Sequence, residues 1–278
     1  MKKVAVLGLG IVGSRVRERL IKAGYLVTCW SRTQRGLAGE KNTPKEALEG
    51  AELVSIYLKD APMVREVFEK AKSSLTRGVI VLNHATIDLA TTLWLAEQCV
   101  AKGCDFIDAP FTGSKNASAT GQLLYYTAGD AELVESLSNF LAVTSKGRIH
   151  CGKIGAATVI KLATNLISAC TMQAMSEALA IAARHGVSPE IFTEAAIRNA
   201  SGSPLMAMKY PGILKGDFEP HFTMAKMWKD SRYALTLAET AGVHLPAITA
   251  VSARMGEMCA EGSGELDYSA LAKAYEGL

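Results

Sequence analysis

The stretch Val4-Ala-Val-Leu-Gly-Leu-Gly-Ile-Val-Gly13 decides the fold of the first half of this chain. Its apolar start predicts a buried β-strand over residues 4–8, and the pattern from 11 to 23 predicts a helix that ends at Gly24. Glycines with the spacing G-x-G-x-x-G connect the two. Such a loop holds the pyrophosphate of a dinucleotide against the amino terminus of the helix. The residues expected to contact the cofactor here are Gly8, Leu9, Gly10, Ile11, Val12 and Gly13.

Strand and helix patterns alternate through the rest of the first half. Further strands are predicted at residues 25–30, 53–58, 79–83, 106–108 and 123–127. Helical patterns lie between them, notably at 62–74 and 88–102. This alternation predicts an α/β fold with a Rossmann-type, doubly wound and largely parallel sheet.

Strand signals stop after about residue 152, and only helical patterns follow. Helices are predicted at residues 156–185, 189–199, 224–241, 246–261 and 268–276. We therefore expect two domains: a dinucleotide-binding domain over residues 1–154 and an all-helical domain over residues 155–278.

Composition narrows the class of protein. A chain of 278 residues with 49% hydrophobic and 21% charged residues is of ordinary globular type and fits about two domains. The net charge of +3 is scattered, which predicts no nucleic-acid partner. The six cysteines form no C-x-x-C pair, which favours reduced thiols in a cytoplasmic protein, and no metal-ligand spacing occurs. Lys161 and Asn165 are among the polar residues that interrupt the apolar stretch 156–183, so a buried helix is expected rather than a membrane span.

The end of the second predicted strand bears on cofactor choice. An NAD-preferring site places Asp or Glu there, but this chain reads Trp30-Ser31-Arg32-Thr33. Arg32 can pair with a 2′-phosphate, with hydroxyl groups from Ser31 and Thr33 beside it. We expect NADPH to be preferred over NAD. The alternative is a solvated surface arginine.

The segment Lys161-Leu-Ala-Thr-Asn165 carries the candidate chemistry. Residues four apart emerge on the same face of a helix, and an ammonium in so apolar a helix is expensive to desolvate. A proton donor beside an amide is what a carbonyl-reducing site requires. The alternative is that Lys161 pairs structurally with a buried acid such as Asp230 or Glu177.

Four segments together resemble the β-hydroxyacid dehydrogenase family, a 6-phosphogluconate dehydrogenase-like group. It includes 3-hydroxyisobutyrate dehydrogenases, tartronate semialdehyde reductases and glyoxylate/succinic semialdehyde reductases. The segments are the glycine loop, Asp108-Ala-Pro-Phe-Thr-Gly-Ser114, Gly155-x5-Lys161-x3-Asn165, and Lys229-Asp230 after Phe222. They stand in family order and span nearly the whole chain.

The resemblance implies roles for particular residues. Lys161 would be the catalytic proton donor, Asn165 would orient the substrate, and Thr112 with Gly113 would bind a substrate carboxylate. Asp230 would lie at the substrate site, where it orients a loop or Lys161. Further cofactor contacts would be Leu58, Thr86 and Lys229.

The chain departs from the family pattern at four positions, one of which is Ala157, where the family often has glycine. Thr112 replaces a usual serine, Ser114 a common glycine and Ala85 a common serine. His84, beside Ala85, is interpreted as structural rather than as a general acid.

We therefore expect an NADPH-dependent reductase that converts a small carboxylate-bearing aldehyde or ketone, of semialdehyde or glyoxylate type, into a hydroxy acid. The resemblance also implies that the helical domain over residues 155–278 serves substrate binding and oligomerisation, so a homodimer or homotetramer is expected, as is usual in the family. One alternative is an imine reductase, although that group usually has Asp or Tyr at the position of Lys161. An alternative of another class is a non-catalytic dinucleotide-binding module, which loss of the lysine would mark.

Overall fold

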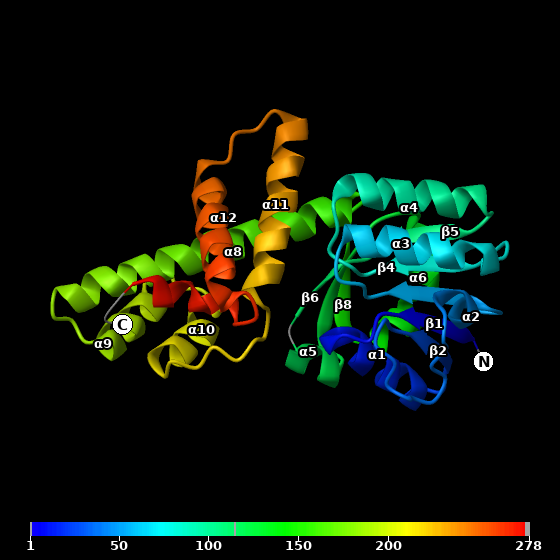
Figure 1. The fold of residues 1–278 in the computed structure, drawn as a ribbon, viewed down its shortest axis with the longest axis horizontal. Coiled ribbons are helices and arrows are strands. Elements are labelled where there is room, and N and C mark those ends of the chain that lie inside the picture. Colours follow the sequence, from blue (N-terminus) through cyan, green and yellow to red (C-terminus); the bar gives the residue numbers. More distant parts are fainter. Residues whose placement is uncertain (1, 114, 276–278) are drawn as a thin grey trace. The chain divides into compact units, whose positions relative to one another are not determined.

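The computed structural model describes residues 2–113 and 115–275. It divides into two compact units, residues 1–161 and residues 162–278, which are described in turn. The elements of both are labelled in Figure 1.

A parallel sheet forms the centre of the first unit. Its strands are β1 (Lys3–Leu7), β2 (Leu26–Trp30), β3 (Leu53–Ile56), β4 (Ile80–Asn83) and β5 (Asp105–Asp108), in the order β2-β1-β3-β4-β5. Each strand lies parallel to its neighbours. The strand order reverses at β1, so the carboxyl ends of β1 and β3 form the switch point at which such sheets bind ligands.

Helices connect these strands, as the alternation predicted. They are α1 (Ile11–Lys22), α2 (Pro44–Leu48), α3 (Ala61–Ala71) with the 3₁₀ turn η1 (Lys72–Ser74), and α4 (Leu89–Ala101). Asp60 and Asp88 cap α3 and α4 by accepting backbone N–H groups at 3.0 and 2.7 Å. Side-chain caps of this kind explain why the helices begin where they do.

The predicted strand at residues 123–127 forms, but in a second sheet. Here β7 (Leu123–Thr127) pairs antiparallel with β6 (Phe111–Thr112) and parallel with β8 (Ser145–His150). Backbone hydrogen bonds between Asp108 and Ala128, at 3.0 and 2.8 Å, connect this sheet to the end of β5. The segments between its strands form α5 (Lys115–Thr120), α6 (Ala131–Ser136) and α7 (Ser138–Ala142).

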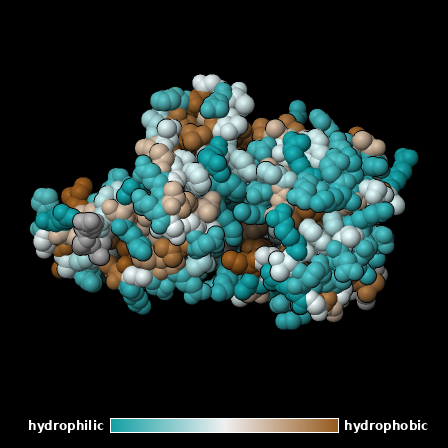
Figure 2. All heavy atoms as spheres, viewed as in Figure 1, coloured by the Kyte–Doolittle hydropathy of each residue, from teal (hydrophilic) through white to brown (hydrophobic). Residues whose placement is uncertain are grey.

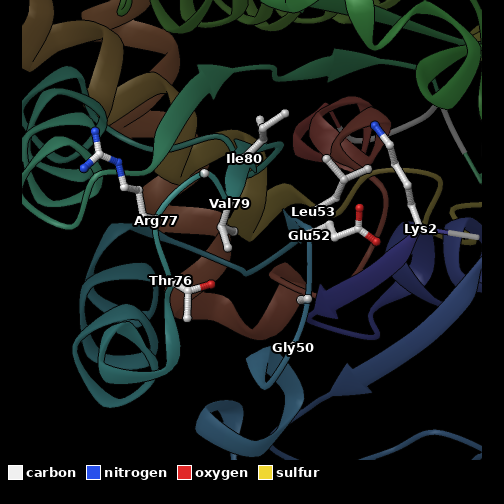
Figure 3. A pocket seen from close by; sticks show the side chains of 10 residues that line it. Lys2, Gly50, Glu52, Leu53, Thr76, Arg77, Val79 and Ile80 are labelled. Atoms are coloured by element: carbon white, nitrogen blue, oxygen red, sulfur yellow. The ribbon is translucent and has the colours of Figure 1, made fainter.

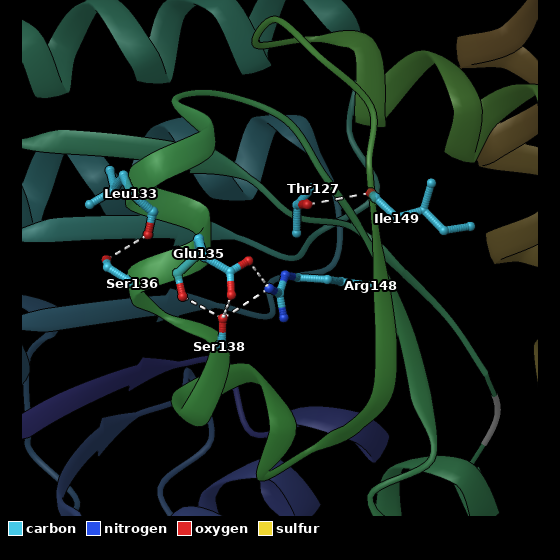
Figure 4. A network of polar contacts seen from close by, with 7 residues as sticks. All are labelled: Thr127, Leu133, Glu135, Ser136, Ser138, Arg148 and Ile149. Atoms are coloured by element: carbon cyan, nitrogen blue, oxygen red, sulfur yellow. Dashed lines mark hydrogen bonds and ion pairs between the residues drawn. The ribbon is translucent and has the colours of Figure 1, made fainter.

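A polar network holds β8 against the neighbouring helices (Figure 4). The Arg148 guanidinium forms an ion pair with Glu135 and donates to Ser138 Oγ at 2.9 Å. On the other side of the strand, Thr127 Oγ1 donates to the carbonyl of Ile149.

The second unit is helical. The long helix α8 (Ala156–Arg184) begins in the first unit and continues through the boundary after Lys161. It is followed by α9 (Pro189–Arg198), α10 (Pro204–Leu214), α11 (Met224–Ala241), α12 (Pro246–Met258), the π-turn η2 (Cys259–Ser263) and the 3₁₀ segment η3 (Tyr268–Ala274). The sequence patterns predicted all of these except α10, where Pro204 and Pro211 obscure the helical period. The predicted last helix is a 3₁₀ segment.

A buried ion pair lies in the core of this unit. Lys209 Nζ is 2.7 Å from Asp267 Oδ1, and both side chains are at most 5% exposed. Asp267 also accepts the backbone N–H groups of His221, Phe222 and Ser269. Burial raises the pKa of Asp267, but these hydrogen bonds and the lysine outweigh it and hold the pKa below its usual value.

The surface is mixed, with hydrophilic residues over much of the face shown in Figure 2. Among the described helices, α8 has the length and mean hydropathy that a membrane span needs, a test that core helices of soluble proteins also pass. Only one side of α8 is buried, because Ile167 and Ile181 on this helix are 62% and 65% exposed.

Candidate active site

The glycine loop after β1 has two glycines that packing requires and one that faces open space. A Cβ on Gly8, whose φ is +99°, would lie 2.5 Å from the Tyr57 carbonyl oxygen, and one on Gly13 would lie 2.0 Å from the Gly8 carbonyl oxygen. A Cβ on Gly10 would meet no atom of the described chain within 4 Å. Backbone at Gly10 is thus open to close approach from outside, directly before α1. This arrangement fits a dinucleotide pyrophosphate.

Neighbouring side chains support the loop from within. Leu9 is 1% exposed and belongs to the core, so it can contact a cofactor only through its backbone. Leu58, which follows β3 at the switch point, is 8% exposed and lies 3.2 Å from the position of a Gly8 Cβ. Ile11 and Val12 are half-buried in the first turn of α1.

The loop after β2 is folded around a glutamate. Glu40 accepts the backbone N–H groups of Arg35 and Leu37 at 2.9 and 3.1 Å. Ser31 is buried and donates its hydroxyl proton to the Thr33 carbonyl at 2.6 Å. The hydroxyl oxygen of Ser31 can therefore act toward other groups only as a hydrogen-bond acceptor. The Arg32 side chain is 65% exposed and lies 3.7 Å from Glu66 of α3. Arg35 is exposed as well, a second cation that the sequence analysis did not single out.

The end of β4 turns sharply into the segment that bears Thr86. Asn83 exchanges hydrogen bonds with the backbone of Ala85, and Thr86, half-buried, follows directly. His84 Nδ1 lies 2.8 Å from the Ala109 carbonyl, which fixes the proton on that nitrogen. Its ring stacks on Tyr57 with centroids 4.5 Å apart. Burial lowers the pKa of His84 to about 4, so the ring is neutral at pH 7, which fits its interpretation as structural.

The predicted carboxylate-binding loop starts at β6. Thr112 is half-buried, and Gly113 has a φ of +126°, where a Cβ would lie 2.9 Å from Leu123 and 3.0 Å from Ala117. Both the positive φ and the lack of space for a Cβ therefore require glycine at position 113. Ser114 lies outside the described residues.

A buried carboxylate joins β5 to the start of α8. Asp108 accepts hydrogen bonds from Thr158 N and Thr158 Oγ1, both at 2.9 Å, and Thr158 Oγ1 lies 3.0 Å from Thr92 Oγ1. Burial raises the pKa of Asp108 to about 6, against the lowering effect of its bonds from Thr158 and Gly155. The sequence motif begins with this residue, but its partner 50 positions away gave no local signal.

Lys161 and Asn165 stand one turn apart on α8, as predicted. Asn165 is 9% exposed, and its Nδ2 donates to Asp230 Oδ2 at 2.7 Å. Lys229 Nζ lies 2.9 Å from the other oxygen of Asp230 and 5.0 Å from the Tyr233 ring centroid. Because Asp230 Oδ2 accepts this hydrogen bond, Asp230 selects the orientation of the Asn165 amide. Within the second unit, the structure thus brings together three predicted residues, Asn165, Lys229 and Asp230.

Among residues 2–113 and 115–275, no three or more His, Cys, Asp and Glu side chains gather in a group that could hold a metal ion. A cavity of about 260 Å³ lies at the amino-terminal edge of the parallel sheet, lined among others by Lys2, Glu52 and Arg77 (Figure 3). It opens at the strand starts, whereas the glycine loop, Leu58 and His84 follow the strand ends. The cavity is therefore separate from the predicted site.

Comparisons with known proteins agree with this geometry. Residues 3–155 match the family model described as the NAD binding domain of 6-phosphogluconate dehydrogenase. Residues 155–275 match the one described as NAD-binding of NADP-dependent 3-hydroxyisobutyrate dehydrogenase.

Among curated proteins, the chain is similar to two from Arabidopsis thaliana. It is 30% identical to glyoxylate/succinic semialdehyde reductase 1 over 98% of both chains. It is 29% identical to the chloroplastic glyoxylate/succinic semialdehyde reductase 2, over 98% of this chain and 78% of that protein.

Solved structures share the fold at lower identity. The 3-hydroxyisobutyrate dehydrogenase of Mycobacterium tuberculosis, with L-serine, aligns over all of both chains with a TM-score of 0.92 and 21% identity. An imine reductase from Pseudomonas sp. aligns over 98% of this chain and 99% of its own with a TM-score of 0.61 and 22% identity.

Fold, glycine loop and relatives define an NAD(P)-dependent dehydrogenase or reductase that acts on a small molecule. More particularly, the chain belongs to the β-hydroxyacid dehydrogenase family.

Proposed function

We propose that this protein uses NADPH to reduce a small carboxylate-bearing aldehyde or ketone, of semialdehyde or glyoxylate type, to a hydroxy acid, with Lys161 as proton donor. The observation that carries the proposal is the position of Lys161 and Asn165 one turn apart on α8, where buried Asp230 orients the amide. The similarity to two glyoxylate/succinic semialdehyde reductases supports the substrate class.

The residues expected to hold the cofactor fall into three groups. Backbone of the loop Gly8 to Gly13 would hold the pyrophosphate, and exposed Arg32 and Arg35 would attract a 2′-phosphate. Leu58, Thr86 and Lys229 would contact the remainder. When bound, the dinucleotide supplies the hydride.

The other groups act on the substrate. The Lys161 ammonium donates a proton to the carbonyl oxygen as negative charge develops there, and the Asn165 amide holds the same end of the molecule. The Thr112 hydroxyl and the Gly113 N–H bind the carboxylate. The extra methyl group of threonine narrows this pocket and favours short oxo acids.

The first experiment measures NADPH oxidation at 340 nm with glyoxylate, succinic semialdehyde, tartronate semialdehyde, methylmalonate semialdehyde and one cyclic imine. Lys161→Ala is expected to lower turnover about 10²–10⁴-fold and to leave NADPH binding intact. Lys153→Ala, an exposed lysine just before α8, is the matched control. Wild-type turnover in Lys161→Ala would refute the assignment.

An imine reductase is the second candidate, because Thr112, Ser114 and Ala85 depart from the family pattern in sequence and imine reductases share the fold. The retained Lys161 argues against it. Turnover of the cyclic imine with silence on all four oxo acids would favour it. Binding of NADPH in a calorimeter without turnover of any compound would instead support a non-catalytic dinucleotide-binding module.

We also propose that the protein is cytoplasmic and forms a homodimer or homotetramer. Exposed apolar side chains on the helical unit, Ile167, Ile181 and Ile191, support the assembly, since each is at least 62% exposed. Light scattering after size-exclusion chromatography tests it, and a monomer at micromolar concentration would contradict it.

A further inference from the structure

Asp108 stands at a junction of three elements. Its backbone ends β5 and exchanges both hydrogen bonds with Ala128, which connects the parallel sheet to the second sheet. Its side chain reaches the first turn of α8. The segment that begins two residues later bears Thr112 and Gly113.

The side chain is held from several directions. Both carboxylate oxygens lie within 3.0 Å of Thr158 Oγ1, and the backbone N–H of Thr158 donates to Oδ2. The backbone of Gly155 contributes a further hydrogen bond. Asp108 and Thr158 are 0% and 3% exposed, so this contact is shielded from solvent. A carboxylate at the amino terminus of a long helix also interacts favourably with the helix dipole.

The contact lies close to Lys161. Thr158 precedes Lys161 by three residues, so the two lie on adjacent turns of one face of α8. A shift or rotation of the first turn would be passed along this rigid helix to the lysine side chain.

We propose that Asp108 is a positioning residue for the reaction: its carboxylate fixes the first turn of α8, and thereby the direction of the Lys161 side chain. The inference rests on the proposed function, in which Lys161 is the proton donor. Packing alone does not require the carboxylate. Two apolar side chains in place of Asp108 and Thr158 would hold the helix against β5 without the cost of desolvating a charge. The carboxylate contributes orientation, because several hydrogen bonds fix both the distance of the first turn of α8 from Asp108 and its rotation about the helix axis.

The test compares Thr158→Val, which keeps the shape and removes the hydroxyl, with Thr158→Ser, which keeps the hydroxyl. Thr158→Val is expected to lower kcat by about 10- to 100-fold, the effect of misplacing a catalytic group by about 1 Å. Thr158→Ser is expected to restore most of that loss. The dissociation constant for NADPH, measured by fluorescence titration, should stay within about twofold of wild type in both.

Asp108→Asn is the second variant, in case Thr158→Val does not fold, and a smaller loss of kcat is expected because the amide keeps one of the two acceptor oxygens that Thr158 contacts. Asp105→Asn, an exposed aspartate of the same strand, is its matched control. Wild-type kcat in folded Thr158→Val or Asp108→Asn would overturn the inference. The inference would also be overturned if Thr158→Ser lost as much kcat as Thr158→Val. It would be overturned, too, if the loss of kcat in these variants came with an equally large loss of NADPH affinity.

Lys161→Ala is measured in the same series. If it keeps wild-type turnover, the proposed function fails. If it loses turnover while Thr158→Val and Asp108→Asn keep it, the proposed function stands and only the positioning role of Asp108 fails.

Discussion

The amide nitrogen of Asn165 lies 2.7 Å from a carboxylate oxygen of Asp230, a residue 65 positions later that is 1% exposed. The second oxygen of that carboxylate lies 2.9 Å from Lys229 Nζ. One buried acid therefore orients the amide of a predicted substrate residue and forms an ion pair with a predicted cofactor residue.

Removal of this acid should weaken substrate binding. Asp230→Ala takes away the acceptor that orients the Asn165 amide, a loss of about 1–3 kcal/mol, and is expected to raise KM for the oxo acid by about tenfold or more. Asp230→Asn, which keeps an acceptor oxygen, should have a smaller effect. Steady-state kinetics at saturating NADPH measure both, and an unchanged KM in Asp230→Ala would count against this role.

The three glycines of the loop should respond differently to alanine. Gly10→Ala is expected to lower NADPH affinity by about tenfold or more while costing less than about 1 kcal/mol of stability, since its Cβ points into open space that the pyrophosphate would need. Gly8→Ala and Gly13→Ala are expected to destabilise the protein itself by about 1–3 kcal/mol, because their Cβ atoms would meet backbone oxygen atoms. Urea unfolding and fluorescence titration separate the two classes. A Gly10→Ala protein that binds NADPH normally would contradict the proposed approach.

Cofactor preference should depend on Arg32 and its acidic neighbour. Arg32→Asp is expected to lower the ratio of kcat/KM for NADPH to that for NADH by about 10- to 100-fold, since charge-assisted hydrogen bonds to a phosphate contribute about 1.5–3 kcal/mol. Glu66→Gln should shift the ratio the other way, because Glu66 competes for the guanidinium at 3.7 Å. Glu69→Gln, on the same helix but paired with Lys72, is the control. If Arg32→Asp leaves the ratio unaltered, the arginine is a solvated surface residue.

Two buried groups should give opposite responses of stability to acid. The pKa of Asp108 is raised from 3.8 to about 6, so its contribution to stability is present in acid and is lost as the pH rises through about 6. The pKa of His84 is lowered from 6.5 to about 4, so its contribution is present above pH 6.5 and is lost as the pH falls toward 4. Between pH 7 and pH 4.5 each effect amounts to about 2–3 kcal/mol, and they largely cancel.

Variants should reveal each effect alone. On acidification to pH 4.5, Asp108→Asn is expected to lose more stability than wild type and His84→Asn to lose less, as measured by urea unfolding at both pH values. Identical pH dependence in the three proteins would show that neither group titrates in this range.

The ion pair in the helical core should be essential for stability. Lys209→Ala is expected to cost about 3–5 kcal/mol, because it leaves the Asp267 carboxylate buried without its cation. Lys215→Ala, an exposed lysine directly after the same helix, should cost almost nothing. Thermal and urea unfolding measure both, and similar stabilities for the two variants would refute the expectation.

The sequence predicted what local patterns encode. The strand and glycine loop before α1, and the face that Lys161 shares with Asn165 on α8, follow from periodicity within about twenty residues. The strand β8, Ser-Lys-Gly-Arg-Ile-His, was missed because its half-exposed residues show no clear alternation. The partners of Asp108 and Asn165 lie 50 and 65 residues away, and no local pattern reports such contacts. The 3₁₀ form of η3 was also unexpected. Its start is capped by Asp267, whose side chain accepts the Ser269 N–H and whose backbone carbonyl accepts the Ala270 N–H.

The contact between Asp108 and Thr158 has a consequence for how the chain is made. A ribosome adds β5 well before α8, so the Asp108 carboxylate leaves the exit tunnel 50 residues ahead of the donors that satisfy it. A nascent chain that ends near residue 154 carries that acid without Thr158, whereas one that extends past Lys161 has both. Resistance of the emerging first unit to protease should therefore appear late and in a single step, when the first turn of α8 clears the tunnel.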